Sequence, residues 1–170
     1  MLRLEIMENT LPALSVQAKL FFTNPCVLSC LFGWLGAQFI KTAINLIRGR
    51  IHSIGELIDW LLWRTGGMPS SHSSMCSALA TTIGFRNGFN SDIFIFALMF
   101  LMMTVRDALG VRRSSGLQAK KINELGSELQ EKKAISLYKK LKEVNGHSPM
   151  EVICGVILGI FIGVAFGLLK

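Results

Sequence analysis

The stretch PMEVICGVILGIFIGVAFGLL, residues 149–169, decides the class of fold. It carries no charged side chain between Glu151 and Lys170, and about 20 apolar residues are enough for a helix to cross a bilayer. Glycine recurs at every fourth position, so one face of the helix can approach another backbone closely. The pattern predicts a membrane-spanning helix with a smooth contact face.

Three more segments have the composition of membrane spans, at 26–47, 69–85 and 91–109. Segment 69–85 is the shortest and the most polar, so it is the weakest of the four. Hydrophobic residues make up 51% of the chain, which is unusual for a soluble domain. The sequence therefore predicts an all-α integral membrane helical bundle with about four transmembrane helices. We expect one membrane domain over 25–170, preceded by an N-terminal arm over 1–24.

The net charge of +7 is concentrated in two connections, 48–67 and 110–148. With four crossings both connections lie on the same side, and basic loops are typical of the cytoplasmic side. We therefore expect a protein of a bacterial inner membrane whose two termini lie outside. Anionic lipid headgroups explain this charge better than nucleic acid does, because the basic residues are not interleaved with aromatic ones.

Two stretches of these connections have the spacing of amphipathic helices. In 53–63 the apolar residues form one face, and in 117–144 they recur close to the helical period. Gly126 and the lysine pair near 132 indicate a break or bend in the second stretch. Both stretches are predicted to be short cytoplasmic helices that lie on the membrane surface.

Ionisable and hydroxyl side chains gather at one end of every predicted span. They are Lys41 and Arg48 in the first, Ser70, Ser71 and His72 in the second, Asp107, Arg112 and Arg113 after the third, and His147 and Glu151 before the fourth. Because the spans alternate in direction, all these groups lie at one membrane face. Ionisable residues at membrane depth are costly and indicate function. Cations, hydroxyl donors and a helix start together predict a site for a phosphate group.

Two histidines in such a site allow a division of labour. One can attack phosphorus, and the other can protonate the leaving alcohol. Glu151, four residues after His147, can hold that imidazole in the required tautomer. Glu151 also matches a helix capping box with Ser148, and the two roles are compatible. Purely structural explanations stay open for the cations, as interfacial or topological markers.

These blocks resemble the motifs of a known enzyme superfamily. Lys41-x6-Arg48, the stretch GGMPSSHSS at 66–74 and His147-x3-Glu151 resemble the three motifs of the type-2 phosphatidic acid phosphatase and vanadium haloperoxidase superfamily. The stretches RDALGVRRSSGLQA and NGHSPMEV resemble more closely its divergent, short bacterial and plastid branch. The resemblance covers about residues 30 to 165.

The resemblance implies a helical membrane enzyme that removes phosphate from a phosphorylated lipid through a phosphohistidine, without a metal or cofactor. It implies that His147 is the nucleophile, His72 the general acid and Glu151 the carboxylate that orients His147. It also implies phosphate-binding roles for four residues, which are Lys41, Arg48, Ser70 and Ser71.

The chain departs from the superfamily pattern at the third motif. Leu141 stands where the family has an arginine six residues before His147, and we expect Arg112 or Arg113 to replace that phosphate ligand. Asp107 has no counterpart, so it would orient Arg112 or bind a divalent cation. Two alternatives to a lipid phosphatase follow: a non-catalytic membrane phospholipid-binding or assembly protein, and a divalent-metal-dependent phosphotransferase that uses Asp107.

The superfamily is usually built from six membrane helices, whereas this chain supplies about four. A pair of chains would complete such a bundle. The homodimer would form through the glycine repeat of the fourth span, Gly155, Gly159, Gly163 and Gly167. The same repeat can instead pack against a helix of its own chain.

Overall fold

The computed structural model describes residues 14–62, 67–141, 143 and 148–169, and for Arg112 and Arg113 it describes the backbone only. The described chain is helical and has no strand. Its helices, in chain order, are α2 (Leu14–Phe22), α3 (Pro25–Ile47), α4 (Ile54–Leu62), α5 (Ser71–Asn87), α6 (Asp92–Arg106), the π-helical turn η1 (Asp107–Val111), α7 (Arg112–Glu131) and α8 (Pro149–Leu168). The predicted all-α membrane bundle is confirmed.

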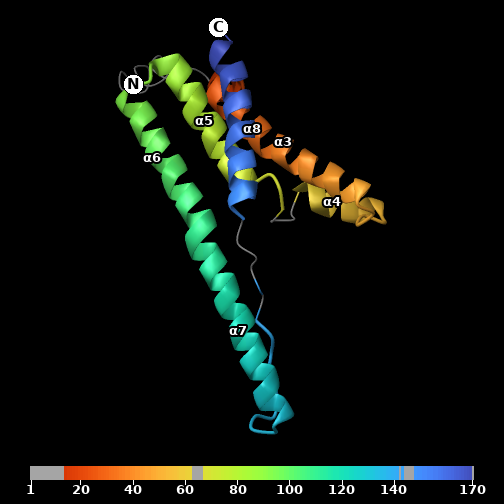
Figure 1. The fold of residues 1–170 in the computed structure, drawn as a ribbon. Coiled ribbons are helices and arrows are strands. Elements are labelled where there is room, and N and C mark those ends of the chain that lie inside the picture. Colours follow the sequence, from red (N-terminus) through yellow and green to blue (C-terminus); the bar gives the residue numbers. More distant parts are fainter. Residues whose placement is uncertain (1–13, 63–66, 142, 144–147, 170) are drawn as a thin grey trace, which may run out of the picture.

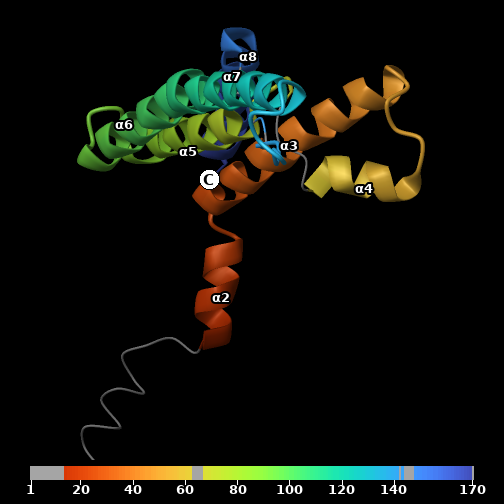
Figure 2. The same cartoon turned by 90° about the horizontal axis from the view of Figure 1, so that it is seen from below.

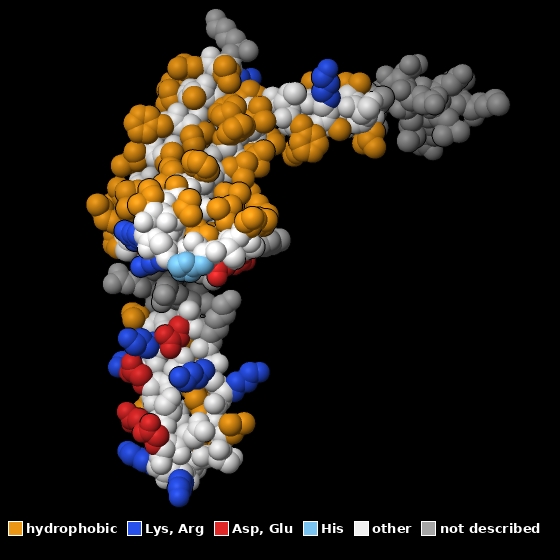
Figure 3. Space-filling model, turned by 90° about the vertical axis from the view of Figure 1, so that its right-hand side faces the viewer, with side chains coloured by type: hydrophobic (Ala, Val, Ile, Leu, Met, Phe, Trp, Pro, Cys, Tyr) orange, Lys and Arg blue, Asp and Glu red, His pale blue; other side chains and the backbone are white. Residues whose placement is uncertain are grey.

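Helix α5 lies at the centre of the bundle and contacts α3, α6 and α8 (Figures 1 and 2). Its buried residues are mainly serine, threonine, alanine and glycine. The largest fully buried side chains of the described residues are Lys41 together with serines and Thr82. Large apolar side chains cover the outside of the bundle instead (Figure 3). Small and polar residues inside with apolar residues outside form the arrangement expected where lipid is the solvent.

Helices α5 and α8 run parallel, with their backbones in contact. A Cβ added at Gly155 would meet the Ser70 carbonyl, and one added at Gly167 would lie 2.6 Å from the Phe85 Cβ. Only glycine leaves room for such an approach, and this explains its four-residue repeat. The glycine face is therefore covered by α5 of the same chain, and a homodimer would have to use another surface.

Three of the described helices are long and apolar enough to cross a membrane: Pro25–Ile47, the continuous Asp92–Glu131, and Pro149–Leu168. The central helix α5 is absent from this group, in agreement with its polar sequence. It nevertheless runs beside α8 from the level of Gly155 to that of Gly167, so it crosses together with α8. Three apolar helices around one polar helix thus give about four crossings.

Helix α6 continues through η1 into α7 as one long rod that projects beyond the bundle (Figure 1). The predicted helix that begins near Leu117 is confirmed as far as Glu131, but it extends the axis of a membrane span and does not lie on the membrane surface. The expected break at Gly126 is wrong, because Gly126 stays helical and the Tyr138 ring packs 2.5 Å from its Cβ position. The other expected position is confirmed, because the helix ends at Glu131 and the chain turns at the lysine pair, where Lys133 has a φ of 56°.

The shorter amphipathic prediction at 53–63 is confirmed as α4, which packs against α3. Its apolar side chains Ile54, Ile58 and Leu62 are exposed. An exposed apolar face of this kind suits a helix at the interface between membrane and water. Helix α2 belongs to the N-terminal arm, and residues 1–13 of that arm lie outside the described residues.

Candidate polar site at the ends of α3, α5 and α8

Lys41 is the first component of the site. It lies on the buried face of α3 with an exposed fraction of only 1%. Its Nζ donates to Gln38 Oε1 at 3.0 Å, one turn earlier on α3, and to Ser71 Oγ at 3.1 Å, in the first turn of α5. An ammonium group inside a protein is stable only when oxygen atoms replace its water shell. The lysine of the first block and the serine of the second, which were expected only at the same membrane face, are therefore in direct contact.

Ser70 starts α5 as its N-cap. Its side-chain oxygen accepts from the Ser73 amide at 3.5 Å and from the Ser73 hydroxyl at 3.0 Å. Its own amide donates to the Glu151 carbonyl at 2.8 Å. The Ser70 amide is therefore bonded to α8, and the Ser70 hydroxyl is bonded to the first turn of α5. The phosphate-binding role suggested for Ser70 remains a prediction, and in this conformation the residue joins two helices.

Glu151 lies in the first turn of α8 and completes the predicted capping box. The Glu151 amide donates to Ser148 Oγ at 3.4 Å, and the Ser148 amide donates to Glu151 Oε2 at 3.3 Å. The carboxylate is also close enough to Lys41 for the two charges to interact. Its structural role is thus confirmed, and its proximity to the buried cation is compatible with a further one.

The three sequence blocks meet at one place, because Lys41 contacts Ser71 and Ser70 contacts Glu151. Each block comes from a different helix, and the shared layer sits where α5 and α8 both begin. First-turn amides have no acceptor within their own helix, and the dipoles of both helices direct positive potential to this end. A buried ammonium beside two helix starts makes an environment that favours an anion.

Two of the predicted residues lie at the margin of this cluster. His72 is exposed, whereas its neighbours Ser71 and Ser73 are buried. Arg48 is exposed at the C-cap of α3, about 10 Å along the helix axis from Lys41. Within the described part of the chain its guanidinium makes no hydrogen bond or ion pair.

Other predicted residues are described in part or not at all. The suggested nucleophile, His147, lies outside the described residues, as do the side chains of Arg112 and Arg113. Asp107 begins η1, where the helix widens from α to π geometry. Such π turns are frequent at functional sites. In the described part of the chain no group of three His, Cys, Asp or Glu side chains has the arrangement of a metal site.

Leu141, at the position of the family arginine, lies on the returning segment beside α7. Its carbonyl accepts from Asn123 Nδ2 at 3.0 Å and its amide donates to Asn123 Oδ1 at 2.8 Å. Asn123 is about 24 Å beyond Asp107 along the rod. This position therefore belongs to the projecting arm and not to the end of the bundle.

Sequence reasoning missed two polar residues of this region. Gln38 accepts from Lys41 and is 3% exposed, and its polar side chain within an apolar span was the signal for it. Ser74, one turn after Ser70, has a buried hydroxyl for which the described residues provide no hydrogen-bond partner. An orphaned hydroxyl of this kind can take an internal water molecule.

Comparison with known proteins covers the part of the chain that carries these blocks. The family model described as "Divergent PAP2 family" matches residues 22–162, a range that contains every block of the cluster. The membrane protein YuiD of Bacillus subtilis, named as uncharacterized, is 37% identical over 151 residues, covering 82% of this chain and 92% of that protein. No solved structure gives a significant match. The chain therefore belongs to the divergent PAP2 family, a branch of a phosphatase-related superfamily of membrane proteins.

Proposed function

We propose that this protein is a membrane lipid phosphatase that hydrolyses a phosphomonoester or diphosphate of a lipid through a phosphohistidine intermediate. The observation that carries the proposal is the meeting of Lys41, Ser71 and Glu151 at the starts of α5 and α8. Membership of a phosphatase-related superfamily supports it. Substrates of this kind keep the phosphate at headgroup depth and the hydrocarbon in the bilayer.

The proposed reaction has two steps. His147 attacks phosphorus, the bond from phosphorus to the lipid oxygen breaks, and His72 gives a proton to the leaving alcohol. Water then cleaves the phosphohistidine and releases inorganic phosphate. Lys41 would neutralise the phosphoryl oxygens through both steps, and Glu151 would orient His147.

Phosphate has to reach a lysine that is almost fully buried. Lys41 already donates to Gln38 and Ser71, so a phosphate oxygen would replace one of these partners. Exchange of a neutral acceptor for an anionic one strengthens the hydrogen bond. We therefore propose that substrate binding draws the Ser71 hydroxyl away from Lys41.

The test is phosphate release by the purified full chain in detergent, from a panel of glycerophospholipid and isoprenoid phosphates. We expect release by the wild type, and a loss of at least about 100-fold for His147→Ala. Equal release by both would reject the nucleophile. Activity that survives EDTA unchanged would exclude the alternative of a divalent-metal-dependent phosphotransferase that uses Asp107.

Separate variants test the proposed replacement for the family arginine. If Arg112 or Arg113 supplies the phosphate ligand that Leu141 lacks, Arg112→Ala or Arg113→Ala should lower turnover by about 10- to 100-fold. Lys120→Ala, which removes an exposed charge farther along α7, is the control. Unchanged turnover in both arginine variants would eliminate the proposed replacement.

A second candidate is a non-catalytic membrane phospholipid-binding or assembly protein. The placement of Leu141 on the arm, beside Asn123, favours it, because an arginine at that position would not reach the bundle end without rearrangement. This candidate predicts that a phosphonate lipid, which cannot be hydrolysed, binds while no lipid phosphate is turned over. Isothermal titration in detergent, run beside the release assay, separates the two candidates.

A further inference from the structure

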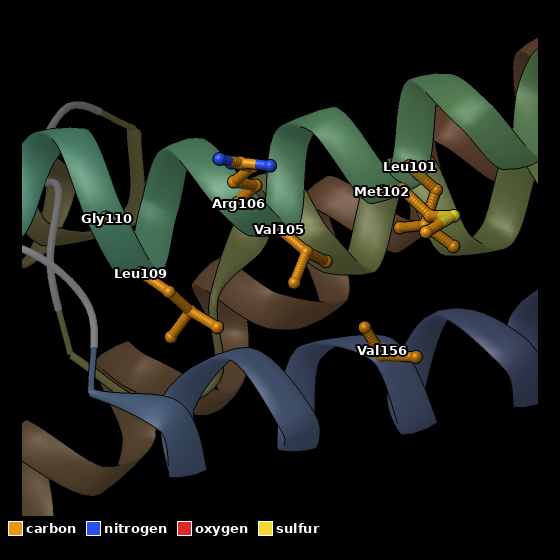
Figure 4. Close-up of a pocket in the computed structure, with 7 residues that line it drawn as sticks. All are labelled: Leu101, Met102, Val105, Arg106, Leu109, Gly110 and Val156. Carbon is orange, nitrogen blue, oxygen red and sulfur yellow. The ribbon is translucent and has the colours of Figure 1, made fainter.

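A groove on the side of the bundle lies between α6–η1 and α8 (Figure 4). Its volume is about 570 Å³, which falls in the range of small-molecule sites. The residues that line it are Leu101, Met102, Val105, Arg106, Leu109, Gly110 and Val156. Both flanking helices pack against α5.

One charged residue, Arg106, interrupts the apolar lining of the groove. Residues 93–105 of α6 carry no charge, so Arg106 marks the level at which this span leaves the hydrocarbon. Leu101 and Val105 therefore lie at the depth of lipid chains, and Arg106 lies at the depth of headgroups. Gly110 marks the end near the first turn of α8, as Figure 4 shows.

Arg106 is the only charged residue among the seven that line the groove. Its side chain is exposed, and within the described residues it makes no ion pair. A guanidinium at headgroup depth binds phosphate oxygens with two parallel hydrogen bonds. The groove thus offers an apolar wall of about 14 Å, from Leu101 to Gly110, with the Arg106 cation about 6 Å from its Gly110 end.

We propose that this groove binds one hydrocarbon chain of an anionic phospholipid from the surrounding bilayer, with the phosphate held by Arg106. The site is separate from Lys41, which lies on α3 at another face of α5. The proposal concerns lipid binding alone, so it does not depend on whether the candidate phosphatase site hydrolyses a lipid phosphate.

Photo-crosslinking of the full chain in zwitterionic nanodiscs tests the proposal. The probe is a non-hydrolysable phosphonate analogue of phosphatidic acid with a diazirine on its chain, and a phosphatidylcholine with the same chain is the reference. We expect residues 101–110 and Val156 to be labelled at least about fivefold more by the anionic probe, the preference that one arginine provides near a membrane surface. Phe161, which is exposed on α8 away from the groove lining, should be labelled equally by both lipids.

Two variants make the test specific. Arg106→Gln should reduce the preference to about onefold, whereas Lys120→Gln, which removes an exposed basic charge on α7, should keep it. Val156→Trp should fill the groove and lower labelling of 101–110 without lowering the unfolding temperature. Equal labelling by the two lipids in the wild type, or an undiminished preference in Arg106→Gln, would overturn the proposal.

Discussion

Lys41 places a positive charge inside a bundle in which the other fully buried side chains of the described residues are neutral. It is held by Gln38 and Ser71, and the charge of Glu151 acts on it. A buried ion rarely improves stability over an apolar residue of the same size. The free energy lost when the ion leaves water is about as large as the free energy gained from its contacts in the protein. Its presence is therefore better explained by binding of an anion than by stability of the fold.

This reasoning predicts the behaviour of Lys41→Met. We expect the unfolding temperature in detergent to stay the same or rise, because methionine fills a similar volume without a buried charge. We expect phosphate release to fall about 100-fold or more, as for loss of one charged donor in an active site. Lys19→Met, at an exposed position on α2, is the control for both measurements. A variant that is both fully active and less stable would assign Lys41 a structural role.

At the scale of elements, the contact of α5 with α8 depends on the absence of side chains. A Cβ at Gly159 would meet the Ser74 carbonyl and lie 2.6 Å from Ser77 Cβ. At Gly36 on α3 the nearest atom to an added Cβ is Ile162 Cδ1 at 3.6 Å, an ordinary contact.

Gly159→Ala should therefore destabilise the bundle by about 1–3 kcal/mol, because the two backbones have to separate. Gly36→Ala should be neutral, or more stable by up to about 1 kcal/mol, since alanine is the better helix former. Thermal unfolding of both variants in the same detergent measures the difference. Equal unfolding temperatures would mean that the backbones are not in contact along this face.

Asn123 joins α7 to the returning chain through several hydrogen bonds. Asn123, which is 7% exposed, bonds to both the amide and the carbonyl of Leu141, to Glu143 Oε1 at 2.8 Å and to the Tyr138 hydroxyl at 2.7 Å. Loss of several bonds to one buried group exposes the returning segment.

Asn123→Ala should consequently speed tryptic cleavage after Lys139 or Lys140 by about tenfold, while the bundle stays intact. A tenfold change corresponds to about 1.4 kcal/mol, close to the net value of one or two such bonds. Gln118→Ala, on an exposed part of α7, should leave the cleavage rate unchanged. Equal rates in the two variants would show that other contacts hold the segment.

Much of this architecture follows from patterns that act over a few residues. The start of α8 at Pro149 was predictable from the capping box of Ser148 and Glu151, and the ends of the apolar spans from charge. These features depend on local bonds and on the length of hydrocarbon to be crossed. The four-residue glycine repeat likewise indicated a close helix contact, although not which helix it meets.

Other features depend on atoms that are distant in sequence. No periodicity indicates that the Ser70 amide donates to Glu151, or that Lys41 bonds to Ser71 and is shielded from water. From the sequence alone, Gly126 resembles a helix breaker. In the structure the ring of Tyr138, twelve positions later, occupies the space that a side chain at position 126 would need. The direction of α7 depends on whether the helix continues straight through η1 or bends there onto the membrane surface. The spacing of apolar residues along α7 would be the same in both arrangements, so it does not predict the direction.

For the whole molecule, the distribution of charge sets an expected orientation. Charged side chains gather on the projecting arm, and apolar ones cover the bundle (Figure 3). By the positive-inside tendency the arm, the connection after α3 and the polar site would face the cytoplasm. The turn between α5 and α6, with Asn90 exposed, would lie outside.

Single-cysteine labelling tests this orientation in a background where the four native cysteines are replaced. Lys132→Cys should react with a membrane-impermeant maleimide only after cell lysis, whereas Asn90→Cys should react in intact cells. Both positions are exposed, so reagent access depends on the compartment alone. The reverse pattern would invert the topology and place the polar site outside.

The polar character of α5 has a consequence for how the molecule is made. A helix whose buried positions are serine and threonine gains little by entering hydrocarbon alone, so the insertion machinery has no thermodynamic reason to release it by itself. The partner that covers its backbone most closely, α8, is synthesised after α6 and α7. Stable placement of α5 therefore waits for synthesis of α8, and a nascent chain that stops before Pro149 leaves α5 without a stable place in the bilayer.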